Sequence, residues 1–393
     1  MVILEQIRTE TPPFMKSQRD SLTWLSEAFS AASRASSQAE NLKTESPDFE
    51  RLLEKVGVKP AQVGHRGHYL PDYAQALHDG APNSIFTRQV PEGRGLDERM
   101  RFYAECSHEI VNRLLPLQEF RRLPRAGEPP RPRDLIHVSC TGYVSPSPTQ
   151  NWIAQHELHE SVQSYHLYHM GCYAALPAIR LAESLARTQR EVHIVHTELC
   201  TLHLRTRDPR LEDLVIHSLF ADGAVAYKVR SLEMSLESDA EAREIDALEL
   251  VKSAEAIIPN SSSAMTWGLG AAAFHMTLSK DVPRWVGGRL PGLLREVGFS
   301  LNIEDEGVVW AIHPGGPKII DHLQEVFRLK DHQIQHSRKI LFERGNMSSA
   351  TLPYVWKEIL EDSRVPHGAD VLAMAFGPGL TICLQHFRVN RVS

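Results

Sequence analysis

The sequence contains no long hydrophobic run, no paired-cysteine motif and no excess of basic residues. A helix that spans a bilayer needs roughly 18 or more apolar residues in a row, and no such window is present. A short apolar run precedes Glu5, without the basic segment and small-residue cleavage site of a secretory signal. We therefore expect a cytoplasmic protein that does not span a membrane.

The cysteines and the charges exclude two further classes of protein. The five cysteines are odd in number and lack CxxC spacing, which is typical of reduced thiols rather than a disulfide framework; they are Cys106, Cys140, Cys172, Cys200 and Cys383. The 43 Lys and Arg are outnumbered by 49 Asp and Glu, giving a net charge of -6. Without a basic stripe carrying interleaved aromatics, a nucleic acid is not an expected partner.

The chain does contain enough apolar sequence for an extensive core. Its 393 residues are 42% hydrophobic and 23% charged, with a mean hydropathy of -0.29, as in soluble globular proteins. Strand-like segments at 135–143 and 191–199 flank a helical pattern that follows Cys172, with Pro177 in its first turn. A strand at 308–316 and the helix after it repeat this order. The alternation predicts an α/β protein.

Three stretches depart from this alternation. Residues 118–135 are rich in Pro and Arg and predict an exposed connection. Residues 232–262 are more polar and less periodic, so we expect them to join an N-terminal unit, residues 1–235, to a C-terminal unit, residues 236–393. Residues 152–170 fit either a helix or a loop.

Three residues are candidates for chemistry, although each has a commoner structural role. Cys172 follows Gly171 at a predicted strand-to-helix turn, where the helix dipole favours a nucleophilic thiolate, yet a lone cysteine is more often simply buried. His313 precedes a glycine-rich loop and could donate to an oxyanion or take a proton, whereas most histidines are structural. Asn346 follows Gly345, where asparagine commonly caps a turn or helix.

Taken together, the local contexts of these residues closely resemble the chalcone-synthase-like family, the type III polyketide synthases of the thiolase superfamily. The resemblance implies an α/β thiolase fold with five αβαβα layers and two pseudo-duplicated halves, a homodimer, and no metal or organic cofactor. The matching segments follow the family's order across essentially the whole chain; they are TPP at 11–13, YHMGCYAALPAIRLAESLA at 168–186, LFADGA at 219–224, FHMTLSKDVP at 274–283, WAIHPGGPKIID at 310–321, GNMSSA at 345–350 and AFGPGLT at 375–381.

The resemblance implies a catalytic set of Cys172, His313 and Asn346. Cys172 would attack an acyl thioester and hold the chain covalently. His313 would keep the thiolate paired with an imidazolium, and His313 with Asn346 would then donate hydrogen bonds to the thioester oxygen of the second substrate. Such donors stabilise the enolate that forms a carbon-carbon bond by Claisen condensation.

The same resemblance assigns residues to substrate binding. Phe220 and Phe274 fall where the family places two gatekeeping aromatics between the substrate tunnel and the reaction chamber. Ser348 falls in the chamber wall. Gly377 and Gly379 are expected to let the backbone approach the chamber, because glycine has no Cβ.

Two departures from the family pattern concern the substrate. Plant members bind the phosphates of coenzyme A with an early cluster of Lys and Arg; Leu53, Val56 and Pro60 stand at those positions here, with Lys55 and Lys59 nearby.

The chamber itself is also expected to differ. The family's interface-crossing loop has methionine where Ser145 precedes Pro146 here. Cys200 and His203 replace threonines, and Met265 replaces a glycine. We therefore expect His203 and Met265 to reshape the substrate-binding cavity.

With these departures, the chain resembles the free-standing ketosynthases of α-pyrone antibiotic biosynthesis, of the myxopyronin and corallopyronin type. Such enzymes join two β-keto chains borne by carrier proteins, and the product closes to a pyrone. The resemblance predicts acyl thioester substrates delivered by an acyl carrier protein. Alternatives are an iterative type III synthase that extends an acyl-coenzyme A starter with malonyl-coenzyme A, and a relative of ketoacyl-carrier-protein synthase III.

Two other classes of protein remain to be weighed. A metalloprotein is suggested by a cluster of zinc-type ligands, His156, Glu157, His159, Glu160, His166 and His169. Its spacing is H-E-x-H rather than the H-E-x-x-H of a metalloprotease helix, so we expect structural or surface histidines and no metal. A thiolase-fold binding protein without condensing activity is disfavoured because all three catalytic candidates are present in context.

Overall fold

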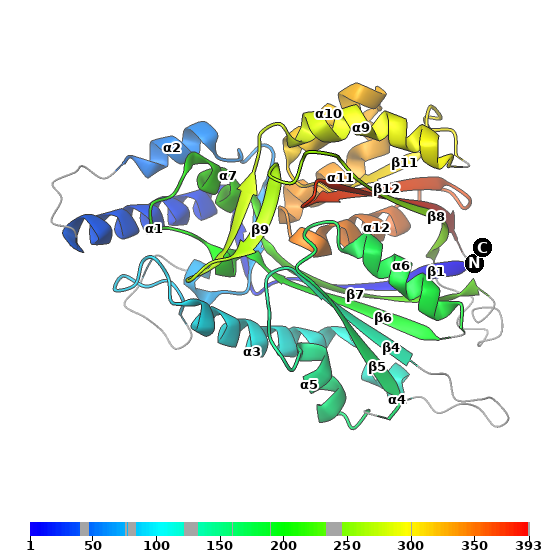
Figure 1. Ribbon diagram of the computed structural model, residues 1–393, viewed down its shortest axis with the longest axis horizontal. Coiled ribbons are helices and arrows are strands. Elements are labelled where there is room, and N and C mark those ends of the chain that lie inside the picture. The colour runs from blue at the N-terminus through cyan, green and yellow to red at the C-terminus, as the bar shows by residue number, and fades with distance from the viewer. Residues whose placement is uncertain are drawn as a thin grey trace.

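The computed structural model describes residues 1–39, 47–74, 77, 84–121, 133–158, 160–188, 190–232, 246–299 and 301–391. Its dominant element is a nine-stranded sheet with the order β11-β12-β13-β8-β1-β7-β6-β4-β5 (Figure 1). The strands are β1 (Val2–Glu10), β4 (Arg133–Ser139), β5 (Val162–Tyr168), β6 (Glu191–Leu199), β7 (Asp222–Ser231), β8 (Ala247–Ile257), β11 (Val309–Ile312), β12 (Asp370–Gly377) and β13 (Thr381–Asn390).

The two halves of this sheet repeat one pairing pattern. In the first, β4 lies parallel to β6, which pairs antiparallel with β7, which pairs antiparallel with β1. In the second, β11 lies parallel to β12, which pairs antiparallel with β13, which pairs antiparallel with β8. The antiparallel pair of β1 with β8 joins the halves. The repeat fits the pseudo-duplication expected from the sequence.

Helices form three layers around the two half-sheets. Alternate residues of a strand point to opposite faces, so Val371 and Ala373 of β12 pack in the central core while Leu372 and Met374 pack in an outer one. The central core holds α6 (Ala175–Ala186) and α12 (Thr351–Glu361), which lie between the half-sheets in Figure 1.

The outer layers cover the remaining two sheet faces. The N-terminal half-sheet packs on α1 (Gln18–Ala39), α2 (Phe49–Val56), α3 (Leu96–Leu114), α4 (Leu117–Arg121), α5 (Pro148–Gln155) and α7 (Leu211–Leu219); the C-terminal half-sheet packs on α9 (Val282–Val297), α10 (Pro317–Phe327) and α11 (Asp331–Arg344). Small elements complete the chain: β2 (Phe14–Ser17), β3 (His65–His68), η1 (Pro71–Ala74), η2 (Cys200–His203), the hairpin of β9 (Met265–Leu269) with β10 (Phe274–Leu278), and η4 (Ser348–Ala350).

The structure revises two sequence-based expectations, and two others fall wholly or partly outside the described residues. Within the stretch 232–262, Ala247–Ile257 form β8 and pair along β13, so this part of the stretch is regular structure that its polar sequence did not reveal. The stretch 152–170 contains the end of α5 and then β5, an edge strand that periodicity did not reveal. The predicted boundary between residues 235 and 236, and residues 122–132 of the predicted exposed connection, lie outside the described residues. In the described part of the chain, helices are too short or too polar to cross a membrane.

Candidate active site

The turn between β5 and α6 places Cys172 at the start of a central helix. Gly171 has a φ of +92°, and a Cβ added to it would lie 2.7 Å from Cδ of Pro378, so glycine is required on both counts. The N–H of Gly171 donates to Sγ of Cys140 at 2.9 Å. These contacts fix the backbone that holds the Cys172 side chain, which is 7% exposed.

Asn346 holds the matching position before the other central helix. It precedes η4 and α12, and its Oδ1 accepts the N–H of Ser348 at 2.9 Å. Its Nδ2 donates to the carbonyl oxygen of Gly315 at 3.4 Å, two residues beyond His313 at the end of β11. His313 is buried, its N–H donates to the carbonyl of Met374 at 2.7 Å, and neither ring nitrogen has a partner among the described residues. The carbonyl of Asn346 accepts the N–H of Ala221 at 2.8 Å, so loops of both halves meet here.

Burial favours the uncharged forms of this group. It raises the pKa of the Cys172 thiol to about 12, an effect partly opposed by hydrogen bonds from Ser348 and Asn346. Burial also lowers the pKa of His313 to about 3. Burial thus favours a thiol and a neutral imidazole near pH 7, and it opposes the thiolate and imidazolium that the family resemblance implies. Forming the nucleophile then requires a proton transfer from Cys172 to a base.

Glu198 is buried behind the cavity wall and connects several parts of the site by hydrogen bonds. Its carboxylate accepts hydrogen bonds from Cys140 N at 3.0 Å and Thr141 Oγ1 at 2.9 Å, and from the hydroxyl of Ser349. Burial raises the pKa of Glu198, while these hydrogen bonds oppose the rise. One carboxylate thus ties β6 to the loop after β4 and to η4, which follows Asn346.

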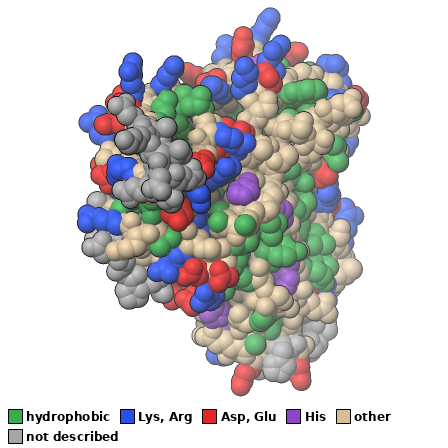
Figure 2. Space-filling view, turned by 60° about the vertical axis from the view of Figure 1, so that its left-hand side comes forward, with side chains coloured by type: hydrophobic (Ala, Val, Ile, Leu, Met, Phe, Trp, Pro, Cys, Tyr) green, Lys and Arg blue, Asp and Glu red, His purple; other side chains and the backbone are tan. Residues whose placement is uncertain are grey.

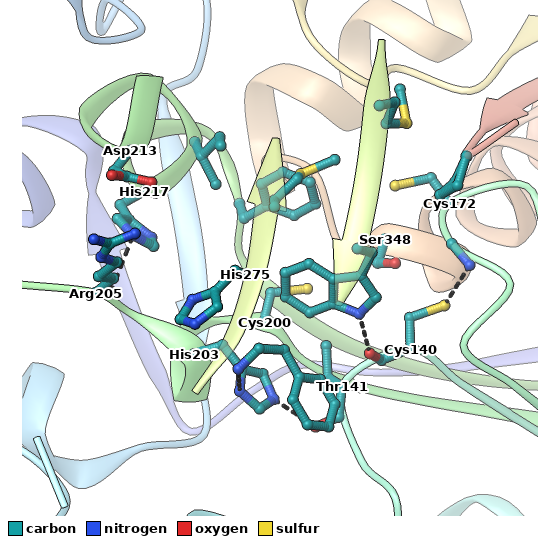
Figure 3. A pocket seen from close by; sticks show the side chains of 18 residues that line it. Cys140, Thr141, Cys172, Cys200, His203, Arg205, Asp213, His217, His275 and Ser348 are labelled. Atoms are coloured by element: carbon teal, nitrogen blue, oxygen red, sulfur yellow. Dashed lines mark hydrogen bonds between the residues drawn. The ribbon is translucent and has the colours of Figure 1, made fainter. Parts of the chain in front are cut away.

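A cavity of about 690 Å³, mouth included, runs away from Cys172 (Figure 3). In the close-up, Cys172 and Cys140 lie at one end, and Arg205, His217 and Asp213 lie at the other. Its walls are Cys140, Thr141, Gly171, Cys172, Cys200, His203, Arg205, Asp213, Ile216, His217, Phe220, Met265, Trp267, Phe274, His275, Met276, Ser348 and Pro378.

Some of the predicted substrate-binding and catalytic residues line this cavity, and others do not. Phe220, Phe274, Ser348, His203 and Met265 all line the cavity together with Cys172. His313 and Asn346 are buried and do not line it.

Gly377 and Gly379 also lie outside the cavity wall. A Cβ on Gly377 would lie 2.1 Å from Cδ1 of Tyr173, and one on Gly379 would lie 2.6 Å from Oγ1 of Thr381. The glycines therefore accommodate neighbouring side chains, and Pro378 between them is the residue of this loop that reaches the cavity.

His203 forms a rigid part of the wall. Its Nδ1 accepts the N–H of Phe274 at 3.2 Å, so its Nε2 carries the proton and donates to the carbonyl of Thr141 at 2.7 Å. The ring stacks on Phe274 with 4.2 Å between centroids and 9° between planes. Beside it, Trp267 Nε1 donates to the carbonyl of Cys140 at 2.6 Å. With both nitrogens satisfied, His203 shapes the cavity and keeps a neutral ring.

Sequence reasoning missed the wall contributed by α7, and in the β9–β10 hairpin it found Met265 and Phe274 but not Trp267, His275 and Met276. Asp213, Ile216 and His217 stand at helical spacings of three and four, which puts them on one face of α7. Trp267 and Met276 are cross-strand partners in the hairpin. Both periodicities are present in the sequence, but neither shows which face turns toward Cys172.

The histidine-rich stretch does not form a metal site among the described residues. His156 Nε2 contacts Asn112 Oδ1 at 3.3 Å, His166 Nε2 contacts Ser147 Oγ at 2.7 Å, and His169 Nε2 contacts the carbonyl of Trp267 at 3.0 Å. These histidines are separated by the end of α5 and by β5. His159 lies outside the described residues.

Comparison with known families accounts for this arrangement. Residues 127–231 match the N-terminal domain of chalcone and stilbene synthases, and residues 249–389 match the C-terminal domain of the same enzymes. The chain belongs to the chalcone and stilbene synthase family. It is accordingly an acyltransferase of the type III polyketide synthase kind, a condensing enzyme that acts on acyl thioesters.

Solved structures similar to this chalcone and stilbene synthase family member share its thiolase fold. The C-terminal type III polyketide synthase domain of Steely1 from Dictyostelium has a TM-score of 0.76 at 22% identity, covering 100% of this chain and 99% of that one. PKS-I from the brown alga Ectocarpus siliculosus gives 0.76 at 22%, covering 98% of each chain. The 1,3,6,8-tetrahydroxynaphthalene synthase of Streptomyces coelicolor A3(2) gives 0.73 at 23%, covering 99% of each. The predicted thiolase fold is confirmed.

Proposed function

We propose that this enzyme loads an acyl chain on Cys172 and joins it, by one Claisen condensation, to a β-ketoacyl thioester borne by a carrier protein. The observation that supports this most is that Cys172 and Ser348 line one end of a mostly apolar cavity, while the amide of Asn346 reaches the Cys172 thiol from behind the cavity wall. A reactive thiol beside amide and hydroxyl donors suits a covalent acyl intermediate, and an apolar cavity suits its chain.

Loading begins with proton transfer. His313 takes the thiol proton of Cys172 as the sulfur attacks the carbonyl carbon of the incoming thioester. The new bond joins Sγ to that carbon, the carbon-sulfur bond of the donor breaks, and His313 returns the proton to the departing carrier thiolate. Both unpartnered ring nitrogens of His313 support this role, because neither is already committed to another hydrogen bond.

Condensation uses the same residues on the second substrate. His313, neutral again after loading, takes the α-proton of a β-ketoacyl thioester and later returns it to the departing Cys172 thiolate. The resulting enolate oxygen accepts hydrogen bonds from His313 and from Nδ2 of Asn346. The weak, 3.4 Å contact of Nδ2 with Gly315 leaves this donor available. The enolate carbon attacks the acyl carbonyl on Cys172, a carbon-carbon bond forms, and the Cys172 thiolate leaves and is reprotonated.

An α-pyrone follows from two β-keto chains. The enol oxygen of the first chain reaches the thioester carbonyl of the second through a six-membered ring. Attack there forms a carbon-oxygen bond, breaks the remaining carbon-sulfur bond and releases the carrier thiol. Every step conserves the oxidation level, so no redox cofactor is required.

Delivery by a carrier protein is supported by the structure of α2. Leu53 is buried in the core, Val56 packs against it, and exposed Pro60 has no charge. The ammonium of Lys59 donates to the carbonyl of Glu54 at the end of the same helix. On the face that includes the α1 and α2 side of the molecule, Lys and Arg are interspersed with Asp and Glu (Figure 2). A cluster suited to coenzyme A phosphates is therefore not favoured here.

The deciding experiment compares two delivery forms of the same chains. Purified enzyme would receive a β-ketoacyl chain on a carrier protein or on coenzyme A, with Cys172 acylation followed by intact mass and products by chromatography. We expect faster loading from the carrier and a pyrone formed after one condensation. Efficient extension of an acyl-coenzyme A starter by malonyl-coenzyme A would instead establish the alternative, an iterative type III synthase.

We also propose a homodimer, as the family resemblance implies. Tyr143, in the loop after β4 that precedes Ser145, is 61% exposed, which leaves its ring open to contact by a second copy. Light scattering coupled to size exclusion should give twice the 44.3 kDa chain mass. A monomer at micromolar concentration would contradict this expectation.

A further inference from the structure

The end of the cavity remote from Cys172 has a different chemistry from the Cys172 end. Cys172, Cys140 and Ser348 lie at one end, whereas the remote end is lined by four ionisable side chains, Arg205, Asp213, His217 and His275 (Figure 3). Ionisable groups are rarely gathered in the wall of an acyl cavity without a purpose, because each one costs solvation there.

The carboxylates at this end are already neutralised. Arg210 donates through its backbone N–H to Oδ2 of Asp213 at 2.8 Å and through Nη2 to Oδ1 at 3.1 Å. The same guanidinium lies 3.4 Å from Glu212. Arg205 differs from Arg210, because its partly buried guanidinium forms no hydrogen bond or ion pair with the described residues; only its backbone N–H is bonded, to His217. Its donors are free to face the cavity.

The two histidines add neutral hydrogen-bonding groups. His217 Nε2 accepts the N–H of Arg205 at 3.1 Å, so the ring proton resides on Nδ1 as a donor. Burial lowers the pKa of His217 to about 4 and also lowers the pKa of His275, so both rings are neutral near pH 7. His275 Nδ1 is buried and has no partner in the described part of the chain. Two independent observations, an uncommitted guanidinium and an orphaned buried nitrogen, therefore point to an absent polar ligand.

We propose that this end of the cavity is a subsite in which Arg205, with His217 beside it, binds a carbonyl or carboxylate oxygen in the remote part of the acyl chain. The inference rests on the proposed loading of that chain on Cys172, since a thioester there directs the other end of the chain toward Arg205. It assigns a substrate class: long acyl chains that carry an oxygen acceptor near their far end.

A phosphate of the carrier arm is a poorer occupant. Arg205 and Arg210 are balanced in formal charge by Glu212 and Asp213, so the remote end offers no surplus of positive charge for a dianion. A single oxygen acceptor needs only the guanidinium donors of Arg205. Hydrogen bonds to a charged donor stabilise by about 1.5–3 kcal/mol, which corresponds to about a 10- to 100-fold preference.

The test compares acyl chains of equal length on N-acetylcysteamine, a thioester that lacks phosphate. One chain ends in a methyl group, one carries a keto group near its end and one ends in a carboxylate. The second-order rate of Cys172 acylation is measured by intact mass. We expect the oxygen-bearing chains to react about 10-fold or more faster with the native enzyme. In Arg205→Met this preference should fall to near one while the methyl-terminated rate is retained, which also reports correct folding.

Two variants sharpen the result. Arg205→Lys should keep part of the preference, and Arg207→Met, at an exposed position in the same loop, should keep all of it. Equal rates for all chains in the native enzyme would overturn the subsite alone. The same chains are also measured on a carrier protein. A loss in Arg205→Met confined to these carrier-bound chains, whatever their terminus, would show phosphate recognition and also overturn the subsite. Absence of any Cys172 adduct would overturn the proposed function and the subsite together.

Discussion

The two ends of the cavity differ in how they accommodate ionisable side chains. At the Cys172 end, potentially charged groups are buried so that they are neutral at rest: the thiol pKa is raised and that of His313 is lowered. At the Arg205 end, charges persist because Arg210 compensates Asp213 and because the end is partly open. The difference teaches that one cavity holds a buried thiol at one end and charged side chains at the other, so each end can be perturbed without the other.

The largest effect is expected at the reactive end. Cys172→Ala should remove the acyl adduct and lower condensation by about 10³-fold or more, because the covalent intermediate cannot form. Intact mass after exposure to acyl thioesters measures the adduct. Cys200→Ala, a thiol in the same cavity wall, is the matched control and should be acylated normally. An adduct that persists in Cys172→Ala would assign the nucleophile to another thiol.

Asn346 should affect condensation more than loading. Asn346→Asp keeps an oxygen acceptor for the N–H of Ser348 but removes the Nδ2 donor. Losing one donor to a developing oxyanion typically lowers the rate about 10²- to 10³-fold. Single-turnover experiments on enzyme already acylated at Cys172 isolate the condensation step. Equal losses in loading and condensation would show that Asn346 acts on structure rather than on the enolate.

The neutral state of the reactive end predicts a steep pH dependence. With the pKa of the Cys172 thiol raised to about 12, the thiolate fraction should rise about tenfold per pH unit from pH 7 to pH 9. The rate of alkylation by iodoacetamide, with Cys172→Ala subtracted as background, should follow that slope. A rate that is already flat above pH 6 would instead show a resting thiolate paired with an imidazolium at His313.

The sequence predicted the reactive end far better than the remote end. Cys172 and Asn346 each precede a central helix and lie within short contiguous motifs. The sequence alone is therefore enough to single them out. Arg205 and His275 come from a loop and a hairpin that meet only through tertiary packing, so no local period marks them. Likewise β8 was missed, because a strand that pairs with β13 and has a partly exposed face can carry polar residues. Pro177, by contrast, correctly indicated the first turn of α6.

The smallest effect concerns the stability of the remote end. Burial alone would raise the pKa of Asp213, but hydrogen bonds from Arg210 outweigh it and the pKa is lowered. A lowered carboxyl pKa contributes stability above the unfolded value, and that contribution is lost as the pH falls through the folded value. Asp213→Asn should therefore lower the free energy of unfolding by about 1 kcal/mol at pH 7, measured by urea denaturation.

The difference between the native enzyme and Asp213→Asn should then shrink as the pH falls and the native carboxyl also becomes neutral. Glu212→Gln, at a more exposed position on α7, provides a control with a smaller effect. A difference that persists at low pH would mean that Asp213 acts through shape rather than charge. Arg210 would then not be neutralised by Asp213, and the charge balance that disfavours a phosphate at the remote end would no longer hold.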